Sequence, residues 1–137
     1  MLTQNPNSSR HATRIMLCED DPMIADMFAM ILEGAGYTVV GQSATGDHAL
    51  SVTEEENPHV ALVDLGLKGE VDGITLVGWL RERNVRPIVV TGNHQRLQVA
   101  VSAGAEAVLL KPVPFKELLD AVNRARDAGG PLCPWTD

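Results

Sequence analysis

The sequence has little of several features that would mark a secreted or membrane protein. Its 137 residues include only two cysteines, Cys18 and Cys133, so a disulfide framework is not indicated. No stretch is long and apolar enough to cross a bilayer, and the polar start of the chain lacks the apolar segment of a secretory signal. These absences favour a cytoplasmic protein without a membrane anchor.

Basic residues and aromatic residues are also scarce. Eleven Lys and Arg against 18 Asp and Glu give a formal net charge of -7. Because DNA binding depends on clustered Lys and Arg that neutralise phosphates, we expect no direct DNA binding. Aromatic residues make up only 4%, so the core must consist of aliphatic side chains and methionine. The overall hydrophobic share of 45% is ordinary for a globular chain of one domain.

Short apolar runs alternate with longer amphipathic segments five times along the chain. The runs predict strands at residues 14–18, 37–41, 59–63, 87–90 and 106–110. The segments between them predict helices that begin at Pro22, span 47–56, follow Gly73, cover 94–103 and come after Pro112. We therefore predict an α/β fold with a doubly wound, five-stranded parallel sheet, a flavodoxin-like three-layer sandwich. A closed barrel would need eight such units.

Domain boundaries follow from the same pattern. We expect one domain at residues 13–128, a disordered N-terminal tail at 1–12 and a C-terminal tail at 129–137. Asp21 stands before Pro22, a pair typical of a helix N-cap and first turn, so we expect Asp21 to cap the first helix rather than to bind a ligand. Cys18 lies in an apolar run and is expected to be a small buried side chain.

Chemically useful side chains follow four of the five predicted strands. Glu19 and Asp20 come after the first strand and Asp64 after the third, while Thr91 and Lys111 come after the fourth and fifth. In a sheet of this kind, ligands bind just beyond the carboxyl ends of the strands. We expect these five side chains to converge at that edge.

Three carboxylates that converge without a cation would repel one another and raise their pKa values. A hard divalent cation removes this conflict, and Mg²⁺ prefers oxygen ligands from one or two carboxylates. We predict Asp20 and Asp64 as direct Mg²⁺ ligands, with Glu19 acting through water and the backbone carbonyl of Gly66 completing the set.

This set of residues points to phosphoryl transfer. A carboxylate such as Asp64 can accept a phosphoryl group as an acyl phosphate, while the Lys111 ammonium and the Thr91 hydroxyl interact with the transferred group. Taken one at a time, these side chains are equally well explained as solvated loop acids, a turn residue, a surface lysine and a strand-end threonine. Their joint position at the strand ends favours the chemical interpretation.

Five segments resemble the receiver domain of two-component response regulators over about residues 14–127. They are IMLCEDDP at 15–22, ALVDL at 61–65, DG at 72–73, PIVVTG at 87–92 and GAEAVLLKP at 104–112. The resemblance implies Asp64 as the phosphoacceptor and Glu19 and Asp20 as the acidic pair. It further implies Thr91 as the switch hydroxyl and Lys111 as the site lysine of the family. It also implies Mg²⁺, a cis Lys111–Pro112 bond, and a phosphohistidine donor on a sensor histidine kinase or phosphotransfer protein.

Three departures from the family pattern affect the expected signal, one of them being Gly92 and Asn93 after Thr91, at positions that influence dephosphorylation in relatives. Val108 occupies the position where an aromatic side chain usually moves together with the threonine, so the usual rotamer switch is excluded. The loop after Asp64 carries Lys68 and Gly69 where a Met-Pro pair is common, and it is about one residue longer.

The sequence thus predicts a signalling switch that changes its contacts with an unknown downstream protein, rather than a turnover enzyme. One alternative is a pseudo-receiver that binds partners without phosphorylation, which Val108 supports. A second is an aspartate-nucleophile phosphatase, which would need a second general acid that we do not find near Asp64. A homodimer is left open, and so is an output domain beyond residue 137.

Overall fold

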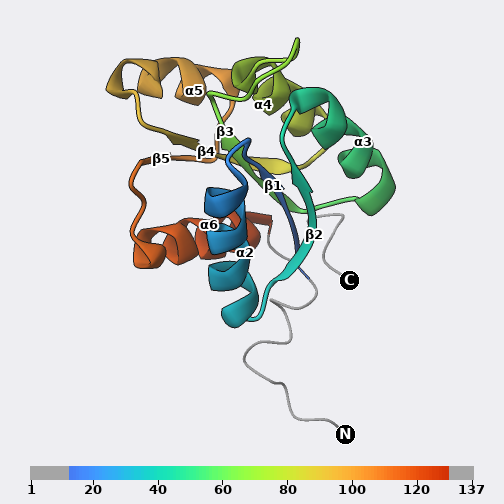
Figure 1. Ribbon diagram of the computed structural model, residues 1–137, viewed down its shortest axis with the longest axis vertical. Coiled ribbons are helices and arrows are strands. Elements are labelled where there is room, and N and C mark those ends of the chain that lie inside the picture. The colour runs from blue at the N-terminus through green and yellow to red at the C-terminus, as the bar shows by residue number, and fades with distance from the viewer. Residues whose placement is uncertain (1–12, 130–137) are drawn as a thin grey trace, which may run out of the picture.

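A parallel sheet of five strands, in the order β2-β1-β3-β4-β5, forms the centre of the computed structural model (Figure 1). The structure describes residues 13–129. The strands are β1 (Arg14–Cys18), β2 (Thr38–Ser43), β3 (Val60–Asp64), β4 (Arg86–Thr91) and β5 (Ala107–Leu110). The chain runs from β1 to one edge of the sheet and then from β3 to the other, which confirms the predicted doubly wound, flavodoxin-like fold.

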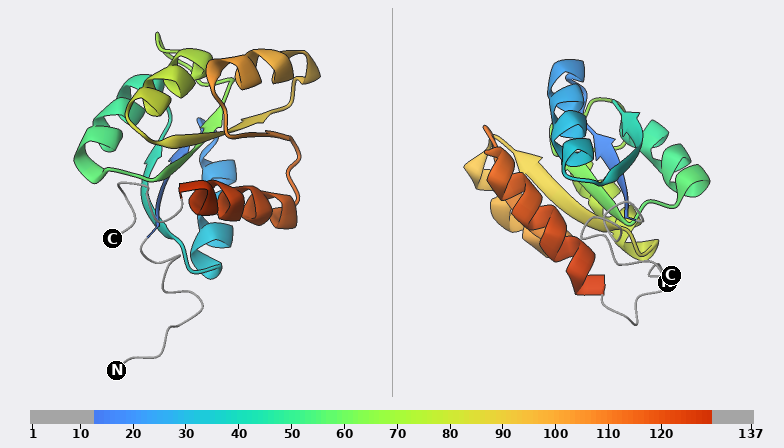
Figure 2. Two further views of the ribbon diagram at one scale, coloured as in Figure 1. Left: turned by 180° about the vertical axis from the view of Figure 1, so that it is seen from behind. Right: turned by 90° about the horizontal axis from the view of Figure 1, so that it is seen from below.

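Helices cover both faces of this sheet (Figures 1 and 2). Helices α2 (Pro22–Gly34) and α6 (Phe115–Gly129) pack on one face. The opposite face carries α3 (Gly46–Glu56), α4 (Gly73–Glu82) and α5 (Leu97–Ala103), the last preceded by a short 3-10 turn, η1 (His94–Arg96). This arrangement is the three-layer sandwich that the alternating pattern predicts.

Two apolar cores separate these layers, and the alternation of side chains along β1 supplies both. Ile15 and Leu17 point into the core under α2 and α6, whereas Met16 and Cys18 point into the core under the other three helices. Cys18 is buried as expected, and burial raises the pKa of its thiol to about 12, so it stays protonated and unreactive.

Side-chain caps fix where three of the helices begin. The capping residues lie in the loops that lead from the carboxyl ends of the strands into these helices. Asp21, Thr45 and Asp72 each accept a backbone N–H from the first turn of the helix that follows, α2, α3 and α4 respectively. The observed bonds confirm Asp21 as a helix cap. The N–H that Thr75 donates to Asp72 lowers the pKa of that carboxyl.

The predicted span 37–41 for the second strand is wrong at both ends. Tyr37 lies between α2 and β2, and its N–H donates to the carbonyl of Leu32 in α2. At the other end, Gly41, Gln42 and Ser43 continue the pairing with β1 despite the polar side chains that suggested an earlier stop. The third and fifth strands each begin one residue later than predicted.

The predicted helix at 94–103 is also only partly right. The segment opens with the 3-10 turn η1, and the α-helix begins at Leu97. The side chain of Asn93 accepts the N–H of Gln95, which stabilises the tight first turn. Helices α2, α3 and α4 begin within one residue of their predicted starts, and α6 follows Pro112 as predicted.

The two predicted tails lie outside the described residues, except that Gly129 is the last residue of α6. Cys133 lies outside them as well. Across residues 13–129, none of the helices has the length and apolar character that a membrane crossing requires.

Candidate functional site

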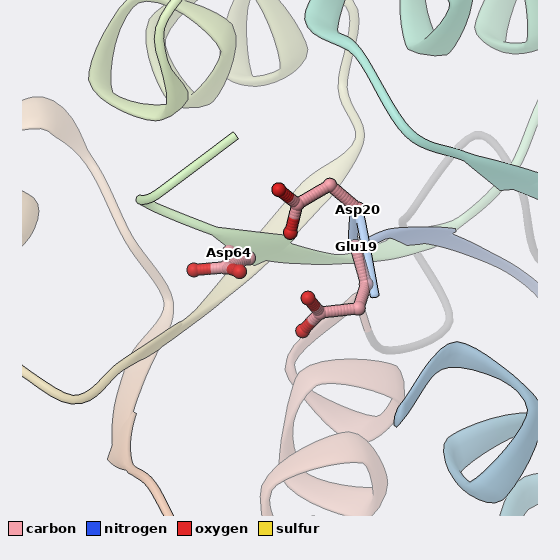
Figure 3. Close-up of side chains that lie close together, drawn as sticks. All are labelled: Glu19, Asp20 and Asp64. Carbon is pink, nitrogen blue, oxygen red and sulfur yellow. The ribbon is translucent and has the colours of Figure 1, made fainter. Parts of the chain in front are cut away.

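Glu19, Asp20 and Asp64 meet at the carboxyl edge of the sheet, where β1 and β3 end side by side. The register pairs Cys18 with Val63, so the next residues of both strands emerge next to each other. One oxygen from each of the three carboxylates lies within 4.8 Å of the other two. Figure 3 shows all three side chains turned toward the same side of the strand ends. We call these three residues the carboxylate cluster.

Lys111 joins this cluster from the end of β5. Its Nζ donates to Glu19 Oε1 at 3.0 Å and to Asp64 Oδ2 at 3.2 Å. The side chains of Glu19 and Asp64 are only 4% and 11% exposed, and that of Lys111 is 26% exposed. Both ion pairs are therefore shielded from bulk water, where such pairs are stronger than at an open surface.

Burial and ion pairing act in opposite directions on these pKa values. Burial raises the pKa of Glu19 above its usual range, with the nearby Asp64 adding to the effect, although Lys111 opposes it. For Lys111, burial alone would lower the pKa, but the bonds to Glu19 and Asp64 outweigh it and raise the pKa. The lysine is thus positively charged at neutral pH, and Glu19 is a carboxylate that binds protons more tightly than usual.

The loop after Asp64 is closely packed around the acid. The Gly66 N–H donates to Asp64 Oδ1 at 2.9 Å, and Leu65 and Leu67 on either side are buried. A Cβ at Gly73 would lie 2.7 Å from the Cα of Leu65 and 2.9 Å from the carbonyl oxygen of Asp64. Only glycine permits this approach, so the start of α4 can pack directly against the backbone that carries Asp64.

Thr91 ends β4 next to β3, one residue beyond the pairing of Val90 with Asp64. The side chain is buried, and its hydroxyl oxygen accepts the N–H of Asn93 at 3.1 Å. Within residues 13–129 the hydroxyl makes no hydrogen bond to the carboxylate cluster. The structure therefore brings Glu19, Asp20, Asp64 and Lys111 into contact and places Thr91 on the adjoining strand.

Lys68 is a site residue whose contact the sequence did not predict. Its Nζ lies 4.0 Å from Asp20 Oδ2, and its side chain is 84% exposed. The only signal in the sequence was a cation in the loop after Asp64 where the family pattern has none. A long flexible side chain at that position has many possible partners, so the sequence does not show which one it meets.

Comparison with known proteins agrees with this geometry. A family profile described as "Response regulator receiver domain" matches residues 15–123. The chain belongs to this family. Receiver domains are components of two-component signalling, and the match covers all five strands and their helices except Arg14 at the start of β1 and the end of α6.

Individual relatives of this receiver support the same assignment. The transcriptional regulatory protein PdtaR of Mycobacterium tuberculosis is 31% identical over 115 residues, which are 82% of this chain and 56% of PdtaR. The DNA-binding response regulator MtrA of Mycolicibacterium smegmatis is 36% identical over 118 residues, 82% of this chain and 50% of MtrA. The chain thus spans about half the length of these curated relatives.

A solved structure gives the corresponding match in three dimensions. The CheY-like response regulator receiver domain protein of Methanospirillum hungatei superposes with a TM-score of 0.77 at 31% identity. The match covers 85% of this receiver and 94% of that chain. The Lys111–Pro112 bond is cis, as the resemblance implies.

The donor atoms of the carboxylate cluster fit a hard divalent cation. They are all oxygens, they lie within 4.8 Å of one another, and they carry more negative charge than the single ammonium of Lys111 balances. Mg²⁺ is bound in proteins through one or two such carboxylates, with water at the remaining positions. The receiver thus has a group of acidic residues that could bind a metal.

Proposed function

We propose that this receiver is a phosphorylation-dependent switch in which Asp64 accepts a phosphoryl group in a Mg²⁺-dependent reaction. The donor is a phosphohistidine on a sensor histidine kinase or phosphotransfer protein. The observation that carries the proposal is the convergence of Asp64 with one ammonium group and two further acids at the edge where ligands of such sheets bind.

The proposed reaction makes Asp64 the nucleophile. A carboxylate oxygen forms a bond to phosphorus, the bond from phosphorus to the donor's imidazole nitrogen breaks, and the imidazole leaves with a proton. The N–H of Gly66 donates to Asp64 Oδ1 and Lys111 pairs with Oδ2, so both oxygens are oriented before the donor arrives. This pre-orientation lowers the entropic cost of reaching the reactive geometry.

The remaining residues act on the transferred group and on the metal. Asp20 and Asp64 are the direct Mg²⁺ ligands in this proposal, with Glu19 one water removed and the Gly66 carbonyl as a backbone ligand. The metal's contribution is to neutralise charge on the phosphoryl oxygens. The Lys111 ammonium can exchange its ion pair with the Asp64 carboxylate for one with a phosphoryl oxygen. The Thr91 hydroxyl can donate a hydrogen bond to another phosphoryl oxygen.

The output of the proposed switch is a change in protein contacts. With a net charge of -7, the chain is not suited to direct DNA binding, so the downstream target is proposed to be a protein. The relatives named above are regulators about twice as long, and their DNA-binding and transcriptional roles belong to those proteins.

Val108 favours a second candidate, a receiver that binds its partner constitutively. Val108 pairs with Val89 in the sheet, and its short side chain packs partly buried against the core under α3, α4 and α5. It has no aromatic ring that could move between a buried and an exposed position when Thr91 moves. A receiver of this kind would bind its partner whether or not Asp64 is phosphorylated.

Intact-protein mass spectrometry after incubation with acetyl phosphate tests the switch chemistry. We expect one added phosphoryl group on the wild type in the presence of Mg²⁺, and none after addition of EDTA. Asp64→Asn should abolish the adduct because the amide cannot act as the acceptor. Asp120→Asn makes the same chemical change at an exposed position of α6 and should leave the adduct intact.

Two outcomes would contradict the proposal. An adduct that persists in Asp64→Asn would place the modification elsewhere. No adduct on the wild type, together with no beryllofluoride complex, would favour the constitutive binding module instead.

A further inference from the structure

We propose that Lys68 sets how tightly this receiver binds its divalent cation, because the Lys68 ammonium competes for the carboxylate of Asp20. The inference rests on the proposed function, since the same carboxylates are the proposed metal ligands. It assigns an effect on cation affinity to Lys68, a residue at which this chain departs from the family pattern.

The two lysines of the site divide the three carboxylates between them. Lys111 contacts Glu19 and Asp64, at 3.0 and 3.2 Å, and leaves Asp20 to Lys68 at 4.0 Å. Asp20 is also the most accessible of the three acids, because its side chain is 24% exposed against 4% for Glu19 and 11% for Asp64. A cation that arrives from solvent therefore meets first the carboxylate that Lys68 accompanies.

The backbone of Lys68 is held in place by its neighbours in the loop. Leu67 is buried in the core, and Lys68 itself forms a parallel bridge with Thr45, the residue that caps α3. Gly69 follows with a φ of 100°, a conformation that favours glycine and turns the chain away. The ammonium therefore extends toward Asp20 from a fixed point, on a side chain that is otherwise in solvent.

The contact is electrostatic rather than a hydrogen bond, because 4.0 Å exceeds hydrogen-bonding distance. A divalent cation on Asp20 has to displace this ammonium or bind beside it, and both lower its affinity. Exposed pairs of this kind are weak, so Lys68 adjusts the affinity by roughly two- to fivefold and does not prevent binding. At 1 M ionic strength the Debye length is about 3 Å, which is shorter than this contact, so high salt should screen the attraction between Lys68 and Asp20.

The direct test is a Mg²⁺ titration of ¹⁵N-labelled protein, followed through the backbone amides of Asp20 and Gly66. Lys68→Ala should bind Mg²⁺ roughly two- to fivefold more tightly than the wild type at low ionic strength. Lys68→Arg keeps the charge and should bind like the wild type. The difference between Lys68→Ala and the wild type should disappear near 1 M salt.

Arg124→Ala is the matched control. It removes one positive charge from an exposed position in the second half of α6. The variant should bind Mg²⁺ like the wild type. Equal tightening in Arg124→Ala and Lys68→Ala would assign the effect to net charge and overturn the inference. Unchanged or weaker binding in Lys68→Ala would overturn it as well.

The rate of phosphorylation by acetyl phosphate supplies an independent readout. Lys68→Ala should react faster than the wild type when Mg²⁺ is limiting and at the same rate when Mg²⁺ is saturating. A rate difference that persists at saturation would overturn the inference, because Lys68 would then act on the chemical step. A wild type that binds no Mg²⁺ would overturn the proposed function as well as the inference. Mg²⁺ binding that is the same in the wild type and in Lys68→Ala would overturn the inference alone.

Discussion

Two charged clusters lie at opposite ends of the strands, and they carry opposite excesses of charge. At the carboxyl ends, the three acids of the carboxylate cluster have two ammonium partners: Lys111 contacts Glu19 and Asp64, and the exposed Lys68 lies beside Asp20. At the amino ends, Arg81 and Arg86 converge on the single carboxylate of Glu106, each at 3.0 Å. We call the second group the guanidinium cluster.

The excess of positive charge in the guanidinium cluster has a local explanation. Arg81 lies in the last turn of α4, where the negative end of the helix dipole stabilises a cation. Its side chain is 43% exposed, so water also solvates the charge. The carboxylate cluster is more deeply buried and has no such compensation. The comparison teaches that the guanidinium cluster is complete as it stands, whereas we expect the carboxylate cluster to gain stability when a cation is added.

The largest expected effect comes from removing the central ammonium of the carboxylate cluster. Lys111→Ala leaves Glu19 and Asp64 close together without a shared cation, which should lower the free energy of unfolding by about 2 kcal/mol in metal-free buffer. Mg²⁺ should restore part of this loss, because it binds the folded variant. Urea unfolding with and without Mg²⁺ measures both effects. A loss that Mg²⁺ does not reduce would contradict the charge imbalance at this site.

The next effect concerns pH. Burial raises the pKa of Glu19, so the folded state binds this proton more tightly than the unfolded chain does, and stability falls as pH rises through the raised pKa. Glu19→Gln lacks this loss. Relative to the wild type, it should gain about 1.4 kcal/mol per unit of pKa elevation as the pH rises from the usual carboxyl range toward neutrality. Urea unfolding across this range without metal checks the trend, and a constant difference would refute it.

The smallest effect is expected in the guanidinium cluster. Arg81→Ala leaves Glu106 paired with Arg86, and the lost pair is exposed, so the free energy of unfolding should change by about 0.4 kcal/mol. Mg²⁺ should make no difference to this variant beyond its effect on the wild type. The same urea experiment applies. A loss as large as that of Lys111→Ala would show that the two clusters do not differ as argued.

The sequence predicted the fold and the strand ends because both depend on local patterns. Four runs of apolar residues ended within one residue of Glu19, Asp64, Thr91 and Lys111, and parallel strands bring such positions to one edge. Strand β2 was misjudged at its ends because it lies at the edge of the sheet, where Gln42 and Ser43 pair without an apolar signal.

The ion pairs could not be predicted in the same way. Lys68 meets Asp20, and Arg81 meets Glu106, across loops whose course depends on packing elsewhere in the molecule. Long charged side chains reach several neighbours from one backbone position. The choice among these neighbours depends on features such as the bridge between Thr45 and Lys68, which the sequence pattern does not reveal.

The bond between Lys111 and Glu19 joins residues 92 positions apart, from the first strand and the last strand of the sheet. Closing a contact of such long range costs chain entropy, which the interactions formed on closure must offset. During synthesis, Glu19, Asp20 and Asp64 are all present well before Lys111 emerges from the ribosome. A chain cut short before β5 therefore lacks the cation that balances its buried acids. Only when the last strand and Lys111 are in place do Glu19 and Asp64 share a cation.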